Sequence, residues 1–420
     1  MDKLVIKGGT TLQGKVNISG SKNGTLPILA ACLLTDKPCT IKGVPQLQDI
    51  KTMVGLLSAL GANVTFDKNT VLICAGNKLS LEAPYDIVSK MRASYYVLGP
   101  LLARFHKVKV YLPGGCAIGP RPIDLHIKGM ESLGANVIIE HGYIDAQAKA
   151  LKGGNILLAG NYGSSVGATA NVMMAATLAQ GTTTIIRAAL EPEIVDLANF
   201  LNRMGAKIEG AGTSMIKITG VKELNGGEWT PIPDRIEAGT FACAAAITKG
   251  NIEINNCCPE HLGAVILLLK NMGCEIIEAN KTMMINASSC LKPINFTTAP
   301  YPGFPTDLQA QFMAVSTVIN GTSVITENIF KSRFLHALEL NRMGAQINID
   351  DNVAIINGVK KLSGAQVMAS DLRASVALVI AGLCAEGETE VSRIYHLDRG
   401  YERLEEKLKG LGATIKRVKE

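Results

Sequence analysis

Apolar and polar residues follow a pattern that repeats six times along the chain. Each repeat contains a short phrase, in which an apolar residue is followed by glycine, a small residue, a variable residue and a second apolar residue. The six phrases are Leu60–Val64, Leu133–Val137, Met204–Ile208, Met272–Ile276, Met343–Ile347 and Leu411–Ile415. Successive glycines of these phrases lie 68 to 73 residues apart. A period this regular indicates an architecture built from repeated supersecondary units.

Each phrase separates a helical pattern from a strand-like pattern. Before Gly205, the apolar residues Ile194, Leu197 and Leu201 lie three or four residues apart, which is the spacing of one helix face. After it, residues 208–218 contain short strand-like runs around a glycine-rich turn. The glycine is therefore predicted to end a helix, because it adopts a left-handed conformation easily, and to lead into a β-hairpin.

A short polar segment, here called a tip, precedes a helix rich in small residues in every repeat. The six tips are residues 21–24, 90–94, 164–169, 234–240, 305–309 and 370–375. The helices that follow include Phe241–Ala246, whose small side chains favour close packing in a core. Because the tips lie at predicted helix N-termini, where N–H groups attract negative charge, they are candidate anion-binding sites.

Six units predict two α/β domains of three units each, with buried helices and outer sheets. The segment Trp229–Pro233 contains two prolines and is predicted to be a linker. Residues 21–230 would form one domain. Residues 231–420 would form the other, together with residues 1–20, whose strand closes its sheet.

Composition and charge argue against several classes of protein. Apolar residues make up 47% and charged residues 19% of the 420 residues, so the chain can bury a large core. The net charge is only +6, no run of five basic residues occurs, and aromatic residues make up 5%, so no nucleic-acid partner is predicted. The longest apolar stretch, Ala374–Ala385, is far shorter than the roughly 20 residues of a membrane helix, so no membrane insertion is predicted.

The ten cysteines are scattered, and none forms a CxxC motif or a metal-ligand spacing with the six histidines. This pattern predicts mostly buried free thiols, a reducing cytoplasm, and neither a metal nor a cofactor. The first residues, 1–7, are predicted to form a strand rather than a secretory signal.

Charged residues at or near the tips are candidates for contacts with an anionic substrate. They are Lys22, Arg92, Arg121, Asp307, Arg373 and Arg399. The alternative interpretation is that each is an ordinary helix cap or a solvated charge, since polar residues are favoured at helix starts in any case. Their repetition at equivalent positions favours a shared function.

Residues 113–122 are predicted to form a loop, because three glycines and three prolines occupy ten positions. Cys116 lies in this loop near Arg121. A neighbouring cation lowers the pKa of a thiol, which predicts a reactive cysteine; a surface cysteine without a role is the alternative.

The chain resembles the enolpyruvyl transferase family, and most closely its UDP-N-acetylglucosamine 1-carboxyvinyltransferases. The resemblance covers the whole chain and rests on long motifs: Ser19–Asn23, Pro113–Pro122, Phe304–Phe312, Asp371–Ala374 and Tyr395–Arg403. It implies two inside-out α/β-prism domains of three units each, with the active site in the cleft between them.

The resemblance also implies the reaction. The enolpyruvyl group of phosphoenolpyruvate would move to the 3′-hydroxyl of UDP-N-acetylglucosamine with release of phosphate, in the first committed step of peptidoglycan synthesis. Transfer to shikimate 3-phosphate on the same fold is one alternative, and a non-catalytic paralogue that binds a UDP-sugar is another. The oligomeric state is not predicted.

Site roles follow from the resemblance alone. Catalytic roles fall to Cys116 as general acid, to Asp307 as the acid–base group near the 3′-hydroxyl, and to Lys22 and Arg399. Substrate contacts fall to Lys22, Asn23, Arg92, Arg121, Pro122, Ile123, Asp124, Leu125, Ser165, Val166, Gly167, Asp307, Ile329, Arg373 and Arg399. Tyr162–Ser164 depart from the family pattern, because some relatives carry a basic residue there, so a diphosphate contact would use the backbone only.

We expect Cys116→Asp to remain active and Cys116→Ser to be much slower, because a carboxyl group delivers a proton that an alcohol holds far more tightly. Steady-state phosphate release measures the ordering. Both variants should bind the nucleotide sugar as the parent does, because Asn23 and Asp307 are unchanged.

Labelling gives a second measurement of the same role. The electrophilic phosphonate fosfomycin should modify the parent at Cys116 and leave the Asp variant unmodified, as mass spectrometry of peptides would detect. A Ser variant as fast as the parent, or a label on another cysteine, would contradict the role of Cys116.

Overall fold

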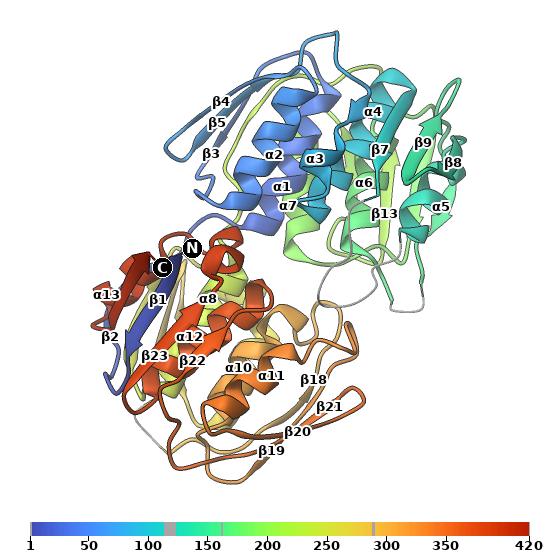
Figure 1. Ribbon diagram of the computed structural model, residues 1–420. Coiled ribbons are helices and arrows are strands. Elements are labelled where there is room, and N and C mark those ends of the chain that lie inside the picture. Colours follow the sequence, from blue (N-terminus) through green and yellow to red (C-terminus); the bar gives the residue numbers. More distant parts are fainter. Residues whose placement is uncertain (1, 113–122, 161–162, 288–289, 420) are drawn as a thin grey trace. The chain divides into compact units, whose positions relative to one another are not determined.

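The computed structural model describes residues 2–112, 123–160, 163–287 and 290–419, and they form two compact units (Figure 1). The repeat 1–3 unit consists of the described residues from Gly20 to Ile232. The repeat 4–6 unit consists of those up to Ser19 and from Pro233 onward. Both units mix helices and sheets, which confirms the predicted α/β class. The predicted domain boundaries lie one and two residues from these divisions.

The repeat 1–3 unit contains several helices in its described part. They are α1 (Lys22–Ala31), η1 (Cys32–Leu34), α2 (Gln48–Ala59), α3 (Tyr85–Val88), η2 (Arg92–Val97), α4 (Leu98–Phe105), α5 (Asp124–Ser132), α6 (Val166–Ala176) and α7 (Pro192–Arg203). Its strands are β3 (Cys39–Lys42), β4 (Asn63–Asp67), β5 (Thr70–Cys74), β6 (Glu82–Ala83), β7 (Lys107–Tyr111), β8 (Asn136–Glu140), β9 (Tyr143–Gln147), β10 (Asn155–Leu157), β11 (Thr182–Ile186), β12 (Lys207–Glu209), β13 (Met215–Thr219) and β14 (Glu228–Trp229).

The repeat 4–6 unit has an equivalent set of elements. Its helices are α8 (Arg235–Ile247), η3 (Pro259–Leu262), α9 (Gly263–Met272), η4 (Thr306–Leu308), α10 (Gln309–Ser316), α11 (Leu335–Arg342), α12 (Leu372–Cys384), η5 (Ile394–Arg399) and α13 (Leu404–Gly410). Its strands are β1 (Asp2–Lys7), β2 (Gln13–Asn17), β15 (Asn251–Asn255), β16 (Glu275–Ala279), β17 (Thr282–Asn286), β18 (Asn295–Thr297), β19 (Thr322–Thr326), β20 (Gln346–Asp350), β21 (Val353–Asn357), β22 (Gln366–Met368), β23 (Glu388–Ser392) and β24 (Thr414–Lys419).

Each unit is built from four-stranded sheets that share one topology. In the described part of the repeat 1–3 unit the strand orders are β14-β3-β5-β4, β6-β7-β9-β8 and β10-β11-β13-β12. In that of the repeat 4–6 unit they are β16-β17-β15-β2, β18-β19-β21-β20 and β22-β23-β1-β24. One edge strand of each sheet pairs in parallel and the other pairs are antiparallel. The sheets of β6 to β9, β10 to β13 and β18 to β21 are each built from one continuous stretch of the chain, whereas the other three each include a strand from a distant part of the sequence.

The ends of each series of repeats close its unit. Strand β14 pairs with β3, so the end of the third repeat completes the sheet of the first. Strands β1 and β2 belong to sheets of the repeat 4–6 unit, as predicted for the first 20 residues, and β1 lies between β23 and β24 (Figure 1). The prediction that Trp229 begins an irregular linker is therefore wrong. Trp229 is in strand β14, and its indole Nε1 donates a hydrogen bond of 2.9 Å to Asp196.

The glycine of every repeat phrase adopts the predicted left-handed conformation. The φ angles of Gly61, Gly134, Gly205, Gly273, Gly344 and Gly412 lie between 92° and 104°. The next residue donates its N–H to a carbonyl five residues earlier, as Ala62 does to Leu57 at 3.0 Å. This pairing satisfies a carbonyl at the helix end and turns the chain sharply into the next strand.

The small-residue helices are buried, as predicted. In α6, α8 and α12 almost every residue is inaccessible to solvent. Close approach depends on side-chain size: a Cβ atom on Gly99 of α4 would lie 2.4 Å from the carbonyl oxygen of Asn171 in α6. Each unit has its own hydrophobic core around these helices.

Three further findings concern only the described residues. No helix among them is long and apolar enough to cross a membrane. They contain no group of three or more potential ligands placed to hold a metal ion. Every cysteine among them is a free thiol, and most are buried.

Candidate active site

Four of the six tips contain a side chain that caps a buried helix. Ser21 accepts a hydrogen bond from the N–H of Gly24 at 3.1 Å, and Asp371 caps α12 by accepting from the N–H groups of Arg373 and Ala374. Ser165 and Asp234 cap α6 and α8 in the same way. The tips with Arg92 and Asp307 differ, because each forms a short 3₁₀ helix without a side-chain cap.

Lys22 and Asn23 are the first residues of α1. The ammonium group of Lys22 lies 2.8 Å from the carboxylate of Asp49 in the first turn of α2, and both side chains are largely buried. Asp49 thus holds the lysine nitrogen at the tip of α1. The sequence analysis did not identify Asp49, which resembles an ordinary first-turn acid in the sequence.

The predicted nucleotide-contacting residues of the repeat 1–3 unit lie on neighbouring elements. Arg92 lies in η2, with its guanidinium carbon 5.9 Å from the ring of Tyr95. The Tyr95 ring in turn lies 5.8 Å from the imidazole of His126, which follows Asp124 and Leu125 in the first turn of α5. A Cβ atom on Gly167 would lie 3.1 Å from that imidazole. The starts of η2, α5 and α6 therefore meet at His126.

Asn171 fixes the imidazole of His126. The Asn171 Oδ1 accepts from the N–H of Gly99 at 2.9 Å, and its Nδ2 donates to the carbonyl of Tyr95 at 3.0 Å. These two partners determine which end of the amide is oxygen. The Nδ2 group also lies 3.0 Å from Nδ1 of His126. Nδ1 is therefore an acceptor, and the neutral imidazole carries its proton on Nε2, at the edge that faces Gly167.

Burial keeps this imidazole neutral. It lowers the pKa of His126 from 6.5 to about 4, and the positive charge of Arg92 acts in the same direction. His336 in the repeat 4–6 unit is also buried, and its pKa is lowered in the same way.

Asp307 is the centre of the candidate site in the repeat 4–6 unit. Its Oδ1 accepts from Nη1 of Arg333 at 2.9 Å, and its Oδ2 accepts from Nη2 of Arg373 at 3.0 Å. The other guanidinium nitrogen of Arg373 donates to the hydroxyl of Tyr401 at 3.1 Å. Gln311 donates to the carbonyl of Asp307 at 3.0 Å and to the same hydroxyl at 3.3 Å.

These arginines determine the charge state of Asp307. Burial alone would raise its pKa, but the positive charges of Arg373 and Arg333 outweigh burial and hold the pKa well below 3.8. Both arginine side chains are about 95% buried, whereas the Asp307 side chain is 28% exposed. The site therefore presents an ionised carboxylate between two cations whose own access to water is small.

The two remaining predicted residues of this unit lie near the same cluster. Arg399 ends η5, which packs against α12, the helix that carries Arg373. Burial and the charge of Arg399 lower the pKa of His396. Ile329 follows the buried Glu327 and donates its N–H to that carboxylate at 2.8 Å. Of the four predicted residues in this unit, Asp307 and Arg373 are in direct contact.

The predicted site residues fall into two sets, one in each unit. Cys116, Arg121 and Pro122 lie outside the described residues. Lys22, Asn23, Arg92, Ile123, Asp124, Leu125, Ser165, Val166 and Gly167 belong to the repeat 1–3 unit, and Asp307, Ile329, Arg373 and Arg399 to the repeat 4–6 unit.

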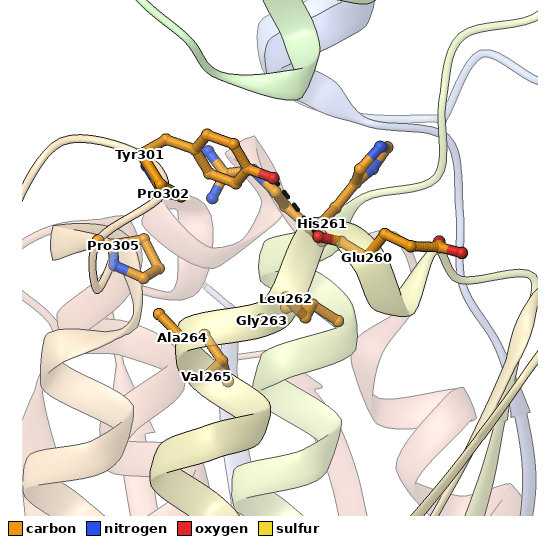
Figure 2. Close-up of a pocket in the computed structure, with 11 residues that line it drawn as sticks. Glu260, His261, Leu262, Gly263, Ala264, Val265, Tyr301, Pro302 and Pro305 are labelled. Carbon is orange, nitrogen blue, oxygen red and sulfur yellow. Dashed lines mark hydrogen bonds between the residues drawn. The ribbon is translucent and has the colours of Figure 1, made fainter. Parts of the chain in front are cut away.

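Pro305, in the tip that contains Asp307, lines a small pocket (Figure 2). Its lining residues come from the start of α8, from η3 with the first turn of α9, and from the segment 301–305. The Tyr301 hydroxyl donates to the carbonyl of Glu260 at 3.4 Å, and the guanidinium carbon of Arg235 lies 5.7 Å from the Tyr301 ring. No predicted site residue lines this pocket.

Sequence reasoning missed several residues that hold the site together: Asp49, His126, Asn171, Glu327, Arg333 and Tyr401. Tyr401 lies inside a motif that the sequence analysis used, and Asn171 follows a tip by a few residues. A polar side chain within a helix of small apolar residues is the one signal that would have found Asn171 and Gln311.

The chain is similar to several known proteins. Residues 6–408 match the family described as EPSP synthase (3-phosphoshikimate 1-carboxyvinyltransferase). Proteins named UDP-N-acetylglucosamine 1-carboxyvinyltransferase match over their whole length and that of this chain. Those from Carboxydothermus hydrogenoformans, where the name ends in 2, and Trichlorobacter lovleyi are each 56% identical, and that from Geobacter metallireducens is 55% identical.

Solved structures extend the comparison. The enolpyruvyl transferase NikO from Streptomyces tendae superposes with a TM-score of 0.90 at 26% identity, and 99% of each chain is covered. EPSP synthase from Acinetobacter baumannii superposes with a TM-score of 0.76 at 19% identity over both whole chains, which shows the fold alone.

These matches define the class of the protein: it is a transferase of the carboxyvinyltransferase, or enolpyruvyl transferase, class. Within that class the chain belongs to the UDP-N-acetylglucosamine 1-carboxyvinyltransferase family, and the predicted resemblance is confirmed.

We expect His126 to make the repeat 1–3 unit less stable in acid. Its folded pKa of about 4 lies below its unfolded value of 6.5, so the unfolded chain binds the extra proton between these pH values. This one group should cost roughly 2 kcal/mol of folding free energy between pH 7.5 and pH 5, and His126→Gln should remove that loss.

The measurement is urea unfolding of parent and variant at both pH values, followed by fluorescence. Trp229, the one tryptophan of the chain, lies in the repeat 1–3 unit and reports on that unit. Burial raises the pKa of Asp196, beside Trp229, to about 6, which opposes the effect but is common to both proteins. An equal pH dependence in parent and variant would show that His126 is not held neutral.

Proposed function

We propose that this protein transfers the enolpyruvyl group of phosphoenolpyruvate to the 3′-hydroxyl of UDP-N-acetylglucosamine and releases phosphate. The observation that carries the proposal is the 56% identity over whole chains to relatives named for that activity. The product would enter peptidoglycan synthesis, and thus support cell-wall growth, cell shape and division, in the cytoplasm. Inhibition by fosfomycin belongs to the same proposal.

The proposed reaction is an addition followed by an elimination. The 3′-hydroxyl oxygen bonds to C2 of phosphoenolpyruvate while C3 gains a proton, and Asp307 takes the proton of the hydroxyl. The tetrahedral adduct then loses a proton from C3 and phosphate from C2, so the double bond returns. Cys116 is proposed to deliver the proton to C3.

The pairing of Asp307 suggests how its basicity is controlled. A carboxylate held by two arginines is a weak base, whereas a general base works best with a pKa near the working pH. Phosphoenolpyruvate is an anion and gives Arg373 a second partner. When an arginine turns from Asp307 to the substrate, the pKa of Asp307 rises and the carboxylate can accept the proton.

The remaining residues are proposed to bind and orient the substrates. Lys22, set by Asp49, and Arg399 offset the negative charge of phosphoenolpyruvate. Asn23 and Ile329 contact the sugar, and the nucleotide is held by the remaining residues of the repeat 1–3 set: Arg92, Arg121, Pro122, Ile123, Asp124, Leu125, Ser165, Val166 and Gly167. Arg121 and Pro122 enter this proposal from the sequence resemblance. The capped N-terminus of α6 suits a phosphate group, because its backbone N–H groups and dipole favour an anion.

Phosphate release separates this function from its alternatives. With phosphoenolpyruvate present, we expect phosphate release on addition of UDP-N-acetylglucosamine and none on addition of shikimate 3-phosphate. Release with shikimate 3-phosphate alone would favour the other transferase activity. Binding of the nucleotide sugar without release would favour a non-catalytic paralogue.

We expect Asp307→Asn to bind UDP-N-acetylglucosamine but to lose roughly 100- to 10,000-fold in turnover, because the amide keeps the shape of the side chain and cannot take a proton. Calorimetry measures binding and phosphate release measures turnover. Asp350→Asn, an exposed change in β20 of the same unit, is the matched control and should leave turnover unchanged. Near-normal turnover of Asp307→Asn would mean that Asp307 only orients the sugar.

A further inference from the structure

A second carboxylate, Glu327, lies behind Asp307 and is fully buried. A buried carboxylate is costly unless its oxygens accept hydrogen bonds. Glu327 accepts four. Its Oε1 accepts from the N–H groups of Ile329 and Phe330 at 2.8 and 2.9 Å and from the hydroxyl of Thr298 at 2.7 Å. Its Oε2 accepts from the hydroxyl of Thr306 at 2.9 Å.

These bonds join two segments that carry candidate site residues. Ile329 is the predicted sugar contact, and Thr306 immediately precedes Asp307. The segments come from different parts of the sequence, after β19 and after β18. Glu327 is one side chain that is bonded to both, so the position of Ile329 relative to Asp307 depends on it.

The hydroxyl of Thr306 has a defined direction. It has one proton, which it gives to Glu327, because the carboxylate only accepts. Its oxygen in turn accepts from Nη1 of Arg333 at 3.0 Å. The same Nη1 donates to Oδ1 of Asp307 at 2.9 Å. Thr306 therefore links Glu327 to the arginine that grips Asp307.

The cluster is balanced in charge. Glu327 and Asp307 supply two negative charges, and Arg333 and Arg373 supply two positive charges. Chains of hydrogen bonds in a site of low dielectric polarise one another, so each bond supports the next. Because Arg333 also donates to the hydroxyl of Thr306, it stays in position when its contact with Asp307 changes.

We propose that Glu327 and Thr306 are positioning residues for the transfer reaction: through Arg333 they set Asp307 relative to the segment of Ile329. The inference rests on the proposed function, because it assigns the two residues a role in that reaction. Neither residue is required to touch the substrate. Their effect follows from geometry, since a misplacement of about 1 Å in a reacting group can cost on the order of 100-fold in rate.

The test compares two substitutions at Thr306. Thr306→Val removes the hydroxyl and leaves Arg333 without this acceptor, whereas Thr306→Ser keeps both hydrogen bonds. We expect the Val variant to lose roughly 10- to 100-fold in kcat, as for other residues that orient a reacting group from behind, with KM for UDP-N-acetylglucosamine within about threefold of the parent. The Ser variant should retain the kcat of the parent.

Thr317 offers a matched control away from this carboxylate. Its hydroxyl is fully buried and donates to the carbonyl of Ala314 at 2.6 Å. Thr317→Val should lower the urea midpoint about as much as Thr306→Val and leave kcat unchanged. If both Val variants lose kcat in proportion to stability, Glu327 is structural only and the proposal is overturned.

A second variant keeps the test decisive if Thr306→Val does not fold. Glu327→Gln has the same shape, and we expect it to lower kcat by a similar factor, because its amide nitrogen would donate to Thr306 and reverse that hydrogen bond. Normal kcat in Glu327→Gln, or equal kcat in Thr306→Val and Thr306→Ser, overturns the positioning role alone. A parent enzyme that releases no phosphate overturns the proposed function instead.

Discussion

The architecture depends on one conformational constraint, the left-handed glycine that ends a helix in every repeat. With φ between 92° and 104°, each of the six glycines closes the last helical turn and sends the chain into a strand. The short connection forces the strand to pack over the helix that it leaves. The helices that end in this way are α2, α5, α7, α9, α11 and α13, whereas the small-residue helices α6, α8 and α12 lie in the two cores.

Electrostatics at these helix starts differs between the units. In the repeat 1–3 unit the charged group, Lys22, is tied to a single buried acid, and His126 is kept neutral by burial. In the repeat 4–6 unit, Asp307 lies within a network of two acids and two arginines. The repeat 1–3 unit thus has one buried ion pair and one neutral imidazole near its helix starts. In the repeat 4–6 unit each carboxylate oxygen of Asp307 accepts from a buried arginine, so the charges there are paired.

Much of the fold could be predicted from the sequence, because the repeat phrase records a local backbone requirement. Gly205 and the spacing of Ile194, Leu197 and Leu201 define one helix end without any tertiary information. Trp229 was misjudged for the opposite reason: nearby prolines indicate a break, and only the parallel partner β3 makes it a strand. Asp307 and Arg373 were found because both lie in repeated tips and in family motifs. Arg333 and Glu327 were not, because their roles depend on partners 20 or more residues away, which no local pattern records.

The order of strands in the last sheet has a consequence for synthesis of the chain. Strand β1 pairs with β23 and β24, so it is synthesised long before its two partners. The repeat 1–3 unit has all its described strands within residues 39–229 and can close during translation. Until β23 and β24 are made, β1 presents unpaired edges that could join other chains, as β2 does until β15 is made. The charged residues Lys3, Lys7 and Lys15 on these strands oppose such association before the sheet is complete.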